Sequence, residues 1–194
     1  MSTRLVVLIS GNGSNLQAIL DACADQTLPA SVVAVISNNP DAFGLTRAQK
    51  AGVPAIAFPK TDGEPRRDYD SRLAALVSTY APDYVILAGW MRLLSSNFLS
   101  SFPNRVINLH PALPGAFPGT HAIERAYEAF LRGEIDRTGV MVHLVPDEGV
   151  DDGPVLATQE IPFQPGEPLE QFEARVHAVE HRLLVETLKS QIVN

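Results

Sequence analysis

A continuous apolar run that leads through a glycine-rich turn into a helical repeat is the feature that most limits the fold. Residues 5–9 (LVVLI) suit a strand that is buried on both faces, as in a parallel sheet. After the turn, apolar residues recur at helical spacing at Leu16, Ile19, Leu20 and Cys23. A strand, a tight turn and a helix in this order predict the first half of a βαβ unit.

The same alternation continues to the end of the chain. We expect further strands at residues 32–36, 84–87, 105–109, 140–145 and 155–161. We expect helices over 41–51, from Pro65 along an apolar face that ends at Tyr80, over 123–130 before Gly133, and over 169–183. The pattern predicts one α/β domain with a Rossmann-like, mostly parallel twisted sheet flanked by helices. Ligands of such sheets bind outside the carboxyl ends of the strands.

Charge and cysteine content exclude several classes of protein. Fifteen basic and twenty-two acidic side chains give a formal charge of −7, whereas nucleic acids and acidic membranes need a dense positive surface. We therefore expect no nucleic-acid partner and no membrane partner. Cys23 is the single cysteine, no apolar run reaches membrane-spanning length, and we see no signal peptide. These features indicate a cytoplasmic protein.

The turn after the first strand, residues 10–15 (SGNGSN), has the composition of an anion-binding loop. Glycines allow a tight turn, and the amides of Ser14 and Asn15 at a helix start attract a bound anion. A plain glycine turn with Ser14 as helix N-cap is the alternative. Leu16 replaces the third glycine of a dinucleotide fingerprint, and residues 37–39 (SNN) contain no acid to hold a ribose. The loop therefore suits one small phosphate.

A second polar group follows the strand at 105–109. Asn108 and His110 flank Leu109, so alternation places both side chains on one face, and a proline- and glycine-rich loop follows. The acidic segment 147–153 reads on its own as a solvated turn, without the ligand spacing of a calcium loop. We find no zinc-ligand spacing and predict no metal. A nucleophile elbow is also absent, which favours direct transfer between two bound substrates.

Four segments stand out together: ISGNGSNLQAI, LAGWMRLLS, NLHPALPG and VDDGPV. In this order, and over essentially the whole chain, they resemble a known family, the folate-dependent formyltransferases that act on phosphoribosylglycinamide in purine biosynthesis. The resemblance implies one formyltransferase domain over residues 1–194. Its N-terminal half would bind the ribonucleotide phosphate, and its C-terminal half would bind folate and carry catalysis. The implied reaction transfers the formyl group of 10-formyltetrahydrofolate to the amine of glycinamide ribonucleotide, in a monomer or homodimer.

The resemblance also implies roles for particular residues. For the ribonucleotide these are Gly13, Ser14, Asn15 and Glu180; for catalysis, Asn108, His110 and Asp151; for folate, Arg66, Met91, Arg92, Leu93, Leu94 and again Asn108. Alternatives stay open for several of them. The apolar folate candidates suit a core as well, and the two arginines suit a plain surface. The acidic loop carries an apparent extra residue, so Asp152 competes with Asp151.

The implied mechanism has no covalent enzyme intermediate. The substrate amine attacks the formyl carbon, and Asn108 and a protonated His110 donate hydrogen bonds to the developing oxyanion. We expect Asp151 to raise the pKa of His110 by charge attraction and to help move a proton.

Three other activities remain possible for such a chain: a formyltetrahydrofolate deformylase, another formyltransferase, or a non-catalytic nucleotide-binding module. The first two kinds of protein carry further domains, which we do not expect here. A non-catalytic nucleotide-binding module would have no need for the three polar residues.

Overall fold

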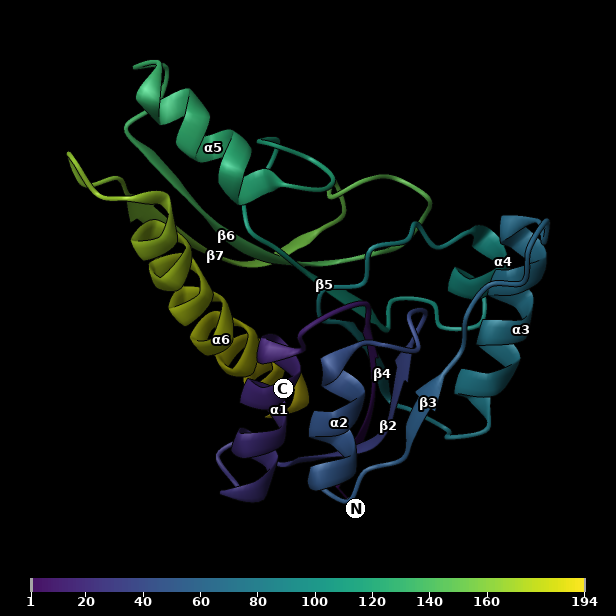
Figure 1. Cartoon of the computed structure of the whole chain (residues 1–194). Coiled ribbons are helices and arrows are strands. Elements are labelled where there is room, and N and C mark those ends of the chain that lie inside the picture. The colour runs from purple at the N-terminus through teal and green to yellow at the C-terminus, as the bar shows by residue number, and fades with distance from the viewer. Residues whose placement is uncertain (1, 194) are drawn as a thin grey trace.

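One seven-stranded sheet runs through the protein, with helices on both faces (Figure 1). The computed structural model describes residues 2–193. Its strands are β1 (Thr3–Ile9), β2 (Ala30–Ser37), β3 (Ala55–Ala57), β4 (Tyr84–Leu87), β5 (Val106–His110), β6 (Arg137–Leu144) and β7 (Val155–Pro162). Its helices are α1 (Ser14–Ala24), α2 (Phe43–Lys50), α3 (Arg66–Ser78), α4 (Ser96–Leu99), α5 (Ala122–Leu131) and α6 (Leu169–Val193).

The strand order is β3-β2-β1-β4-β5-β6-β7. The first five strands in this order pair in parallel, whereas β6 and β7 join the sheet antiparallel. This arrangement confirms the predicted mostly parallel α/β sheet. The parallel register places Leu8 of β1 beside Leu87 of β4, and Leu87 beside Asn108 of β5. The carboxyl ends of these three strands therefore meet at one edge of the sheet, where ligands of such folds bind.

Burial on both faces explains the apolar run of the first strand. Residues 5–9 of β1 are all fully buried. Leu5, Val7 and Ile9 pack into a core under α1, α2, α5 and α6, while Val6 and Leu8 pack into a second core under α3 and α4. A central parallel strand covered on both sides has no solvent-facing positions, so its sequence shows no polar alternation.

The structure differs from the sequence predictions mainly in its short elements. Neither β3, with three residues, nor α4, with four, was predicted, because such lengths show no measurable periodicity. Pro65 is the N-cap of α3 rather than a residue of its first turn. The last helix extends to Val193, well beyond the predicted segment, because buried Leu184 and Leu188 continue its apolar face.

Two further features bear on possible functions. No helix within residues 2–193 combines the length and hydropathy needed to cross a membrane. The Cys23 thiol is partly buried on α1, and this burial raises its pKa to about 11. A thiol with so high a pKa is almost entirely protonated near neutral pH and makes a poor nucleophile.

Candidate active site

The glycine-rich loop connects β1 to α1 with a left-handed residue at the helix start. Gly13 is the N-cap of α1 and has a φ of 76°. The alternative in which Ser14 caps the helix is therefore wrong, because Ser14 is already the first helical residue. The first amides of a helix have no partner within it and carry the positive end of its dipole. The Oδ1 atom of Asn15, beside these amides, is buried without a hydrogen-bond partner among the described residues.

Ser10 ties this loop to the ends of two other strands. Its hydroxyl donates to Asn38 Oδ1 at 2.5 Å, after β2, and accepts from the Met91 N–H at 2.8 Å, after β4. Its own N–H donates to the Gly89 carbonyl at 3.0 Å. The candidate phosphate loop and the segment that contains the candidate folate residues 91–94 are thus held directly together.

The three predicted catalytic side chains meet at the end of β5. Asn108 Nδ2 donates to Asp151 Oδ1 at 3.1 Å, and His110 Nδ1 lies 3.3 Å from Asp151 Oδ2. The Asp151 side chain is 12 % exposed and also accepts the Gly119 N–H at 2.8 Å. It reaches this position with a φ of 54°, a left-handed conformation that costs energy for a residue other than glycine. An amide, an imidazole and a carboxylate from distant parts of the chain therefore form one cluster.

The competing acid points elsewhere. Asp152 is exposed, and its carboxylate lies against the backbone of Gly149, where it leaves no room for a Cβ. Asp151 is therefore the acid that contacts His110, despite the apparent insertion in this loop.

His143 is a fourth member of the cluster and was missed by sequence reasoning. Its side chain is 2 % exposed, and antiparallel pairing of β5 with β6 places it opposite Asn108. Its Nδ1 lies 2.8 Å from the Leu144 carbonyl, so Nδ1 carries a proton and donates it. With the proton on Nδ1, Nε2 is placed to accept from Asn108 Nδ2 at 3.1 Å. Pairing the predicted strand at 105–109 antiparallel with the one at 140–145 would have revealed this neighbour.

Two opposed effects act on the pKa of His110. Burial lowers the pKa of His110 below the free imidazole value, and the nearby Asp151 carboxylate offsets only part of that effect. Asp151 thus acts in the predicted direction, but desolvation has the larger effect, so the protonated ring of the predicted mechanism is less favoured than in a free imidazole. The ring still has an acceptor at each nitrogen, since Nε2 lies 3.1 Å from the Phe117 carbonyl.

The carboxylate itself is favoured in its charged form. Burial raises the pKa of Asp151, but the nearby His143 ring, the hydrogen bond from the Gly119 N–H and the attraction of His110 together lower it further than burial raises it. The net pKa lies below the usual aspartate value. Asp151 is thus an anion at neutral pH, able to accept hydrogen bonds and to attract a proton.

The candidate folate residues divide into exposed and buried groups. Met91 is 64 % and Leu93 is 48 % exposed, whereas Leu94 is 4 % exposed and belongs to the core under α3 and α4. The core alternative thus holds for Leu94 and fails for the other two. The guanidinium of Arg92 lies 5.0 Å from the centre of the Tyr69 ring. Large exposed apolar side chains beside a strand end suit contact with a flat aromatic ligand.

Arg66 has an internal partner. Its guanidinium pairs with Glu148, whose carboxylate also accepts the Ser96 N–H at 2.9 Å. Glu148 belongs to the loop that carries Asp151, so this pair links α3 to that loop. Arg66 is thus a partly exposed cation with an internal partner, which is compatible with both the folate role and the plain-surface alternative.

Glu180 lies on α6, which packs against α1, and it is 4 % exposed. His177 Nδ1 lies 2.6 Å from Glu180 Oε2, and this hydrogen bond raises the pKa of His177. Burial lowers the pKa of the next residue, His181, and the positive charge of Arg47 adds to the lowering. Because Arg47 contacts Asn12 in the glycine-rich loop, this part of α6 lies near the candidate phosphate site.

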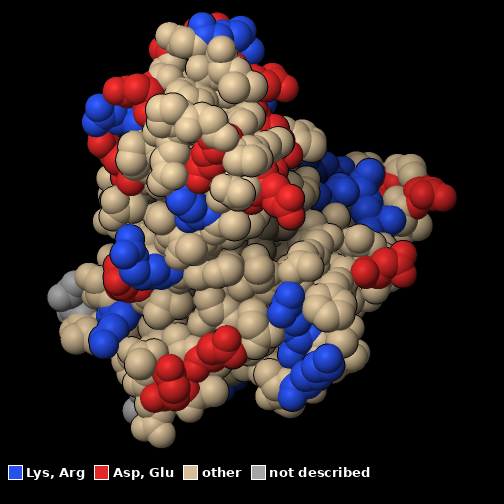
Figure 2. Space-filling view, turned by 60° about the vertical axis from the view of Figure 1, so that its left-hand side comes forward, with Lys and Arg blue, Asp and Glu red and all other residues tan. Residues whose placement is uncertain are grey.

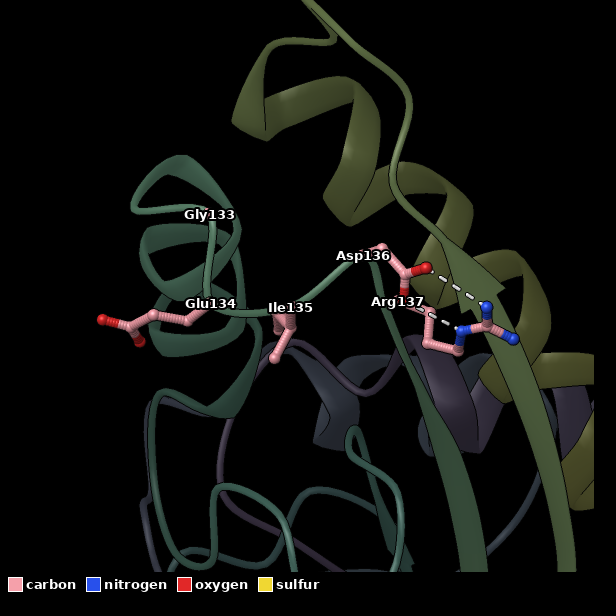
Figure 3. A pocket seen from close by; sticks show the side chains of 5 residues that line it. All are labelled: Gly133, Glu134, Ile135, Asp136 and Arg137. Carbon is pink, nitrogen blue, oxygen red and sulfur yellow. Dashed lines mark hydrogen bonds and ion pairs between the residues drawn. The ribbon is translucent and has the colours of Figure 1, made fainter.

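Other surface features lie apart from this cluster. A hollow of about 470 Å³ is lined by residues 133–137 and contains no candidate site residue; Asp136 and Arg137 pair with each other there (Figure 3). On the face in Figure 2, acidic and basic side chains are interspersed, apart from a compact basic group near the right-hand edge. Within residues 2–193, no set of three or more His, Cys, Asp or Glu side chains is arranged to hold a metal ion.

Comparison with known proteins assigns the chain to a family. The sequence profile described as "Formyl transferase" matches residues 3–188. A phosphoribosylglycinamide formyltransferase of Dictyostelium discoideum is 44 % identical over 202 residues, covering 97 % of this chain and 98 % of the relative. The Escherichia coli protein of the same name is 43 % identical over 179 residues, covering 92 % of this chain and 82 % of the relative.

Solved structures agree with the sequence comparison. Glycinamide ribonucleotide transformylase 1 from Geobacillus kaustophilus superimposes with a TM-score of 0.91 at 40 % identity, covering 99 % of this chain and 100 % of that one. The transformylase 1 from Symbiobacterium toebii gives a TM-score of 0.90 at 41 % identity, with coverages of 97 % and 86 %. A full-length match in sequence and in backbone leaves one conclusion: the chain belongs to the formyl transferase family.

Proposed function

We propose that the protein transfers the formyl group of 10-formyltetrahydrofolate to the primary amine of glycinamide ribonucleotide. The products are N-formylglycinamide ribonucleotide and tetrahydrofolate, and the reaction is a step of purine biosynthesis. Full-length relatives named phosphoribosylglycinamide formyltransferase support this activity, and membership of the formyl transferase family implies a folate-type co-substrate.

The observation that carries the proposal is the contact of Asn108 and His110 with the buried carboxylate of Asp151. Two N–H donors and an anion, held within hydrogen-bonding distance of one another, can stabilise an oxyanion and accept a proton. A chain that only bound nucleotides would not need an amide, an imidazole and a carboxylate held together at the end of one strand.

The two substrates meet across the strand ends. In our proposal the ribonucleotide phosphate binds the amides at Gly13, Ser14 and Asn15, and Glu180 lies near the substrate amine. The folate binds along the segment after β4, with contacts from Arg66, Met91, Arg92 and Leu93 and with Asn108 at the reacting end, while Leu94 packs in the core beneath this segment. The Ser10–Met91 hydrogen bond supports this placement, because it fixes the two binding segments against each other.

Both ligand sites draw on both halves of the chain. Glu180 of the last helix would serve the ribonucleotide, and Arg66 of the first half would serve the folate. We therefore propose that residues 1–194 act as one domain and not as two separate binding halves. A single continuous sheet supports this view.

The reaction begins with attack of the amine nitrogen on the formyl carbon. A C–N bond forms and the formyl oxygen becomes an anion, which accepts hydrogen bonds from His110 and Asn108. His110 Nε2 lies 3.1 Å from the Phe117 carbonyl. In our proposal the formyl oxygen takes the place of this carbonyl as the ring's acceptor. Collapse of the intermediate breaks the bond to the folate nitrogen. The proton lost by the amine passes by way of Asp151 and water to that nitrogen.

The Asn108 amide must also exchange a partner. Its Nδ2 hydrogens point to Asp151 Oδ1 and to His143 Nε2, both at 3.1 Å. His143 is buried and held by its own bond to the Leu144 carbonyl, so it keeps the amide nitrogen in place. The hydrogen directed at Asp151 is the one that turns to the formyl oxygen.

A purified-protein assay tests the proposal. Protein, glycinamide ribonucleotide and 10-formyltetrahydrofolate are mixed, and the absorbance change of folate deformylation is followed with and without the ribonucleotide. We expect turnover that depends on the ribonucleotide and yields one formylated product per tetrahydrofolate. Equal rates without the ribonucleotide would assign the protein to the deformylases, and no turnover in either case would refute the proposal.

A further inference from the structure

The glycine-rich loop is held by a cation from the neighbouring helix. Arg47, in the second turn of α2, directs three donors at the loop and the start of α1. Its Nε donates to the Asn12 carbonyl at 2.9 Å and its Nη2 to Asn12 Oδ1 at 2.9 Å, while Nη1 donates to Gln17 Oε1 at 3.2 Å. One planar guanidinium thus donates hydrogen bonds to Asn12 before, and to Gln17 after, the turn that contains Gly13 and Ser14.

The backbones of the loop and of α2 are also in direct contact. The Gly44 N–H donates to the Gly11 carbonyl at 3.1 Å. A Cβ on Gly13 would lie 2.7 Å from Gly44 Cα, and a Cβ on Gly44 would lie 2.3 Å from the side chain of Ile9. The backbone contact leaves no room for a side chain at Gly13, and a side chain at Gly44 would displace the end of Ile9. The start of α2 therefore packs closely against the loop, and α1 and α2 lie side by side in Figure 1.

The loop does not stabilise its own turn with a side-chain cap. The N-cap of α1 is Gly13, which makes no side-chain hydrogen bond, and its φ of 76° is one that a flexible glycine adopts at an entropic cost. A loop of this kind needs an external support if its amides are to point constantly at one position. Arg47 is the side chain that supplies three bonds to it.

The positive charge of Arg47 also favours anion binding at the loop. A guanidinium stays protonated throughout the physiological range and presents five N–H groups in a fixed plane. Three of these groups are used on Asn12 and Gln17, and the charge remains next to the loop. It adds to the helix dipole of α1 in favouring a dianionic phosphate group.

We propose that Arg47 is the positioning residue of the phosphate loop: it holds Asn12 and Gln17 so that the amides between them bind a phosphate monoester. The inference rests on the proposed function, because it assigns the loop to the ribonucleotide substrate. Arg47 touches the loop and not the reacting atoms, so its removal weakens binding of the ribonucleotide in the ground state and the transition state alike. Such a loss raises the KM and leaves kcat nearly unchanged.

The experiment compares Arg47→Ala, Arg47→Lys and a matched control. Arg4→Ala is the control, because Arg4 is an exposed arginine that also holds backbone carbonyls, those of Tyr80 and Ala81, at the opposite end of β1. We expect Arg47→Ala to raise the KM for glycinamide ribonucleotide by about tenfold or more, the effect of losing charge-assisted hydrogen bonds. The KM for the folate and kcat change by less than about threefold, and the control changes neither KM.

The lysine variant distinguishes the positioning role of Arg47 from the effect of its charge. An ammonium group keeps the charge but cannot reach Asn12 and Gln17 at once in the planar fork of a guanidinium. We expect Arg47→Lys to recover only part of the lost affinity. Full recovery of the ribonucleotide affinity by lysine would overturn the positioning role. A fall in kcat at an unchanged ribonucleotide KM would overturn the whole inference. Because lysine is a mild change, this variant also keeps the test valid if Arg47→Ala fails to fold.

A binding measurement separates this inference from the proposed function. Inorganic phosphate and glycinamide ribonucleotide are each titrated against the wild type and the variants, and the rise in melting temperature is recorded. We expect both ligands to stabilise the wild type and the Arg4→Ala control more than Arg47→Ala. This result would support the role of Arg47 even if the wild type failed to formylate the ribonucleotide. Equal stabilisation of all three proteins would overturn it.

Discussion

Replacing Asp151 with asparagine tests the catalytic cluster most sharply. The carboxylate accepts hydrogen bonds from Asn108 at 3.1 Å and from the Gly119 N–H at 2.8 Å, and it faces His110 at 3.3 Å. An asparagine side chain has one acceptor oxygen in place of two and no charge. Whichever way the amide turns, its NH₂ group faces at least one of these donors.

The magnitude follows from the lost contacts. A hydrogen bond to a charged group contributes about 1.5–3 kcal/mol, and removal of one oxyanion-hole donor costs a similar amount. A loss of about 3 kcal/mol in transition-state stabilisation corresponds to a fall in kcat of more than about a hundredfold. The phosphate loop and the segment after β4 make none of these bonds, so both KM values stay within about threefold of the wild type.

Asp152→Asn is the matched control for this measurement, because it makes the same chemical change one residue later. Asp152 is exposed and turned toward Gly149, so its variant should retain nearly full activity. Steady-state rates with both substrates varied, together with circular dichroism to verify folding, give the comparison. If Asp151→Asn kept near-normal turnover, or if Asp152→Asn lost as much, our assignment of the acid would be refuted.

Four further predictions concern charge, reactivity, packing and folate binding. The pKa of His110 in the folded protein is below its usual 6.5, so as the pH falls the unfolded chain binds this proton first, and His110 destabilises the fold below about pH 6.5. The loss of melting temperature between about pH 7.5 and about pH 5.5 should therefore be smaller in His110→Gln than in the wild type. An equal or larger loss in the variant would contradict the lowered pKa. Since the pKa of Cys23 is about 11, iodoacetamide at about pH 8 should label the native protein far more slowly than the urea-unfolded protein, as followed by mass spectrometry; equal rates would argue against burial of the thiol. Phe172 is fully buried and stacks on Phe163 at 4.5 Å between ring centres, so Phe172→Ala should lower the free energy of unfolding by about 3–5 kcal/mol in a denaturant titration, and a loss below about 1 kcal/mol would show that this core is loosely packed. Arg66→Ala should raise the KM for the folate by about tenfold, because the variant loses a cation that can pair with a ligand carboxylate, and it should change the ribonucleotide KM little. An unchanged folate KM would show that Arg66 serves only its ion pair with Glu148.

The sequence predicted the long elements and the parallel sheet because their signals are local. A buried apolar run such as residues 5–9 and a helical repeat such as that of α1 are complete within a dozen residues. The strand at 84–87 was predicted with the bounds that the structure shows. The three-residue strand β3 gives no such signal, and its position depends on pairing with β2, which is a tertiary contact.

The candidate site was predictable in its residues but not in its electrostatics. Asn108 and His110 could be placed on one face from strand alternation alone. His143 was missed because its role depends on the antiparallel register of β5 with β6. The net direction of the His110 pKa shift could not be predicted, because sequence shows the neighbouring charge of Asp151 and not the depth of burial around the ring. Arg47 could not be recognised from sequence either, since its partner Asn12 lies 35 residues away.

The most direct test of the account follows the formyl carbon itself. A single turnover is run with enzyme in excess over 10-formyltetrahydrofolate that carries a ¹³C-labelled formyl group, in the presence of glycinamide ribonucleotide, and the products are identified by mass spectrometry. We predict that the label appears in N-formylglycinamide ribonucleotide for the wild type, and that an Asn108→Ala, His110→Ala double variant forms this product at least about a hundredfold more slowly. Label recovered as free formate, or transfer by the double variant at the wild-type rate, would contradict the claim that this cluster catalyses direct transfer between the two substrates.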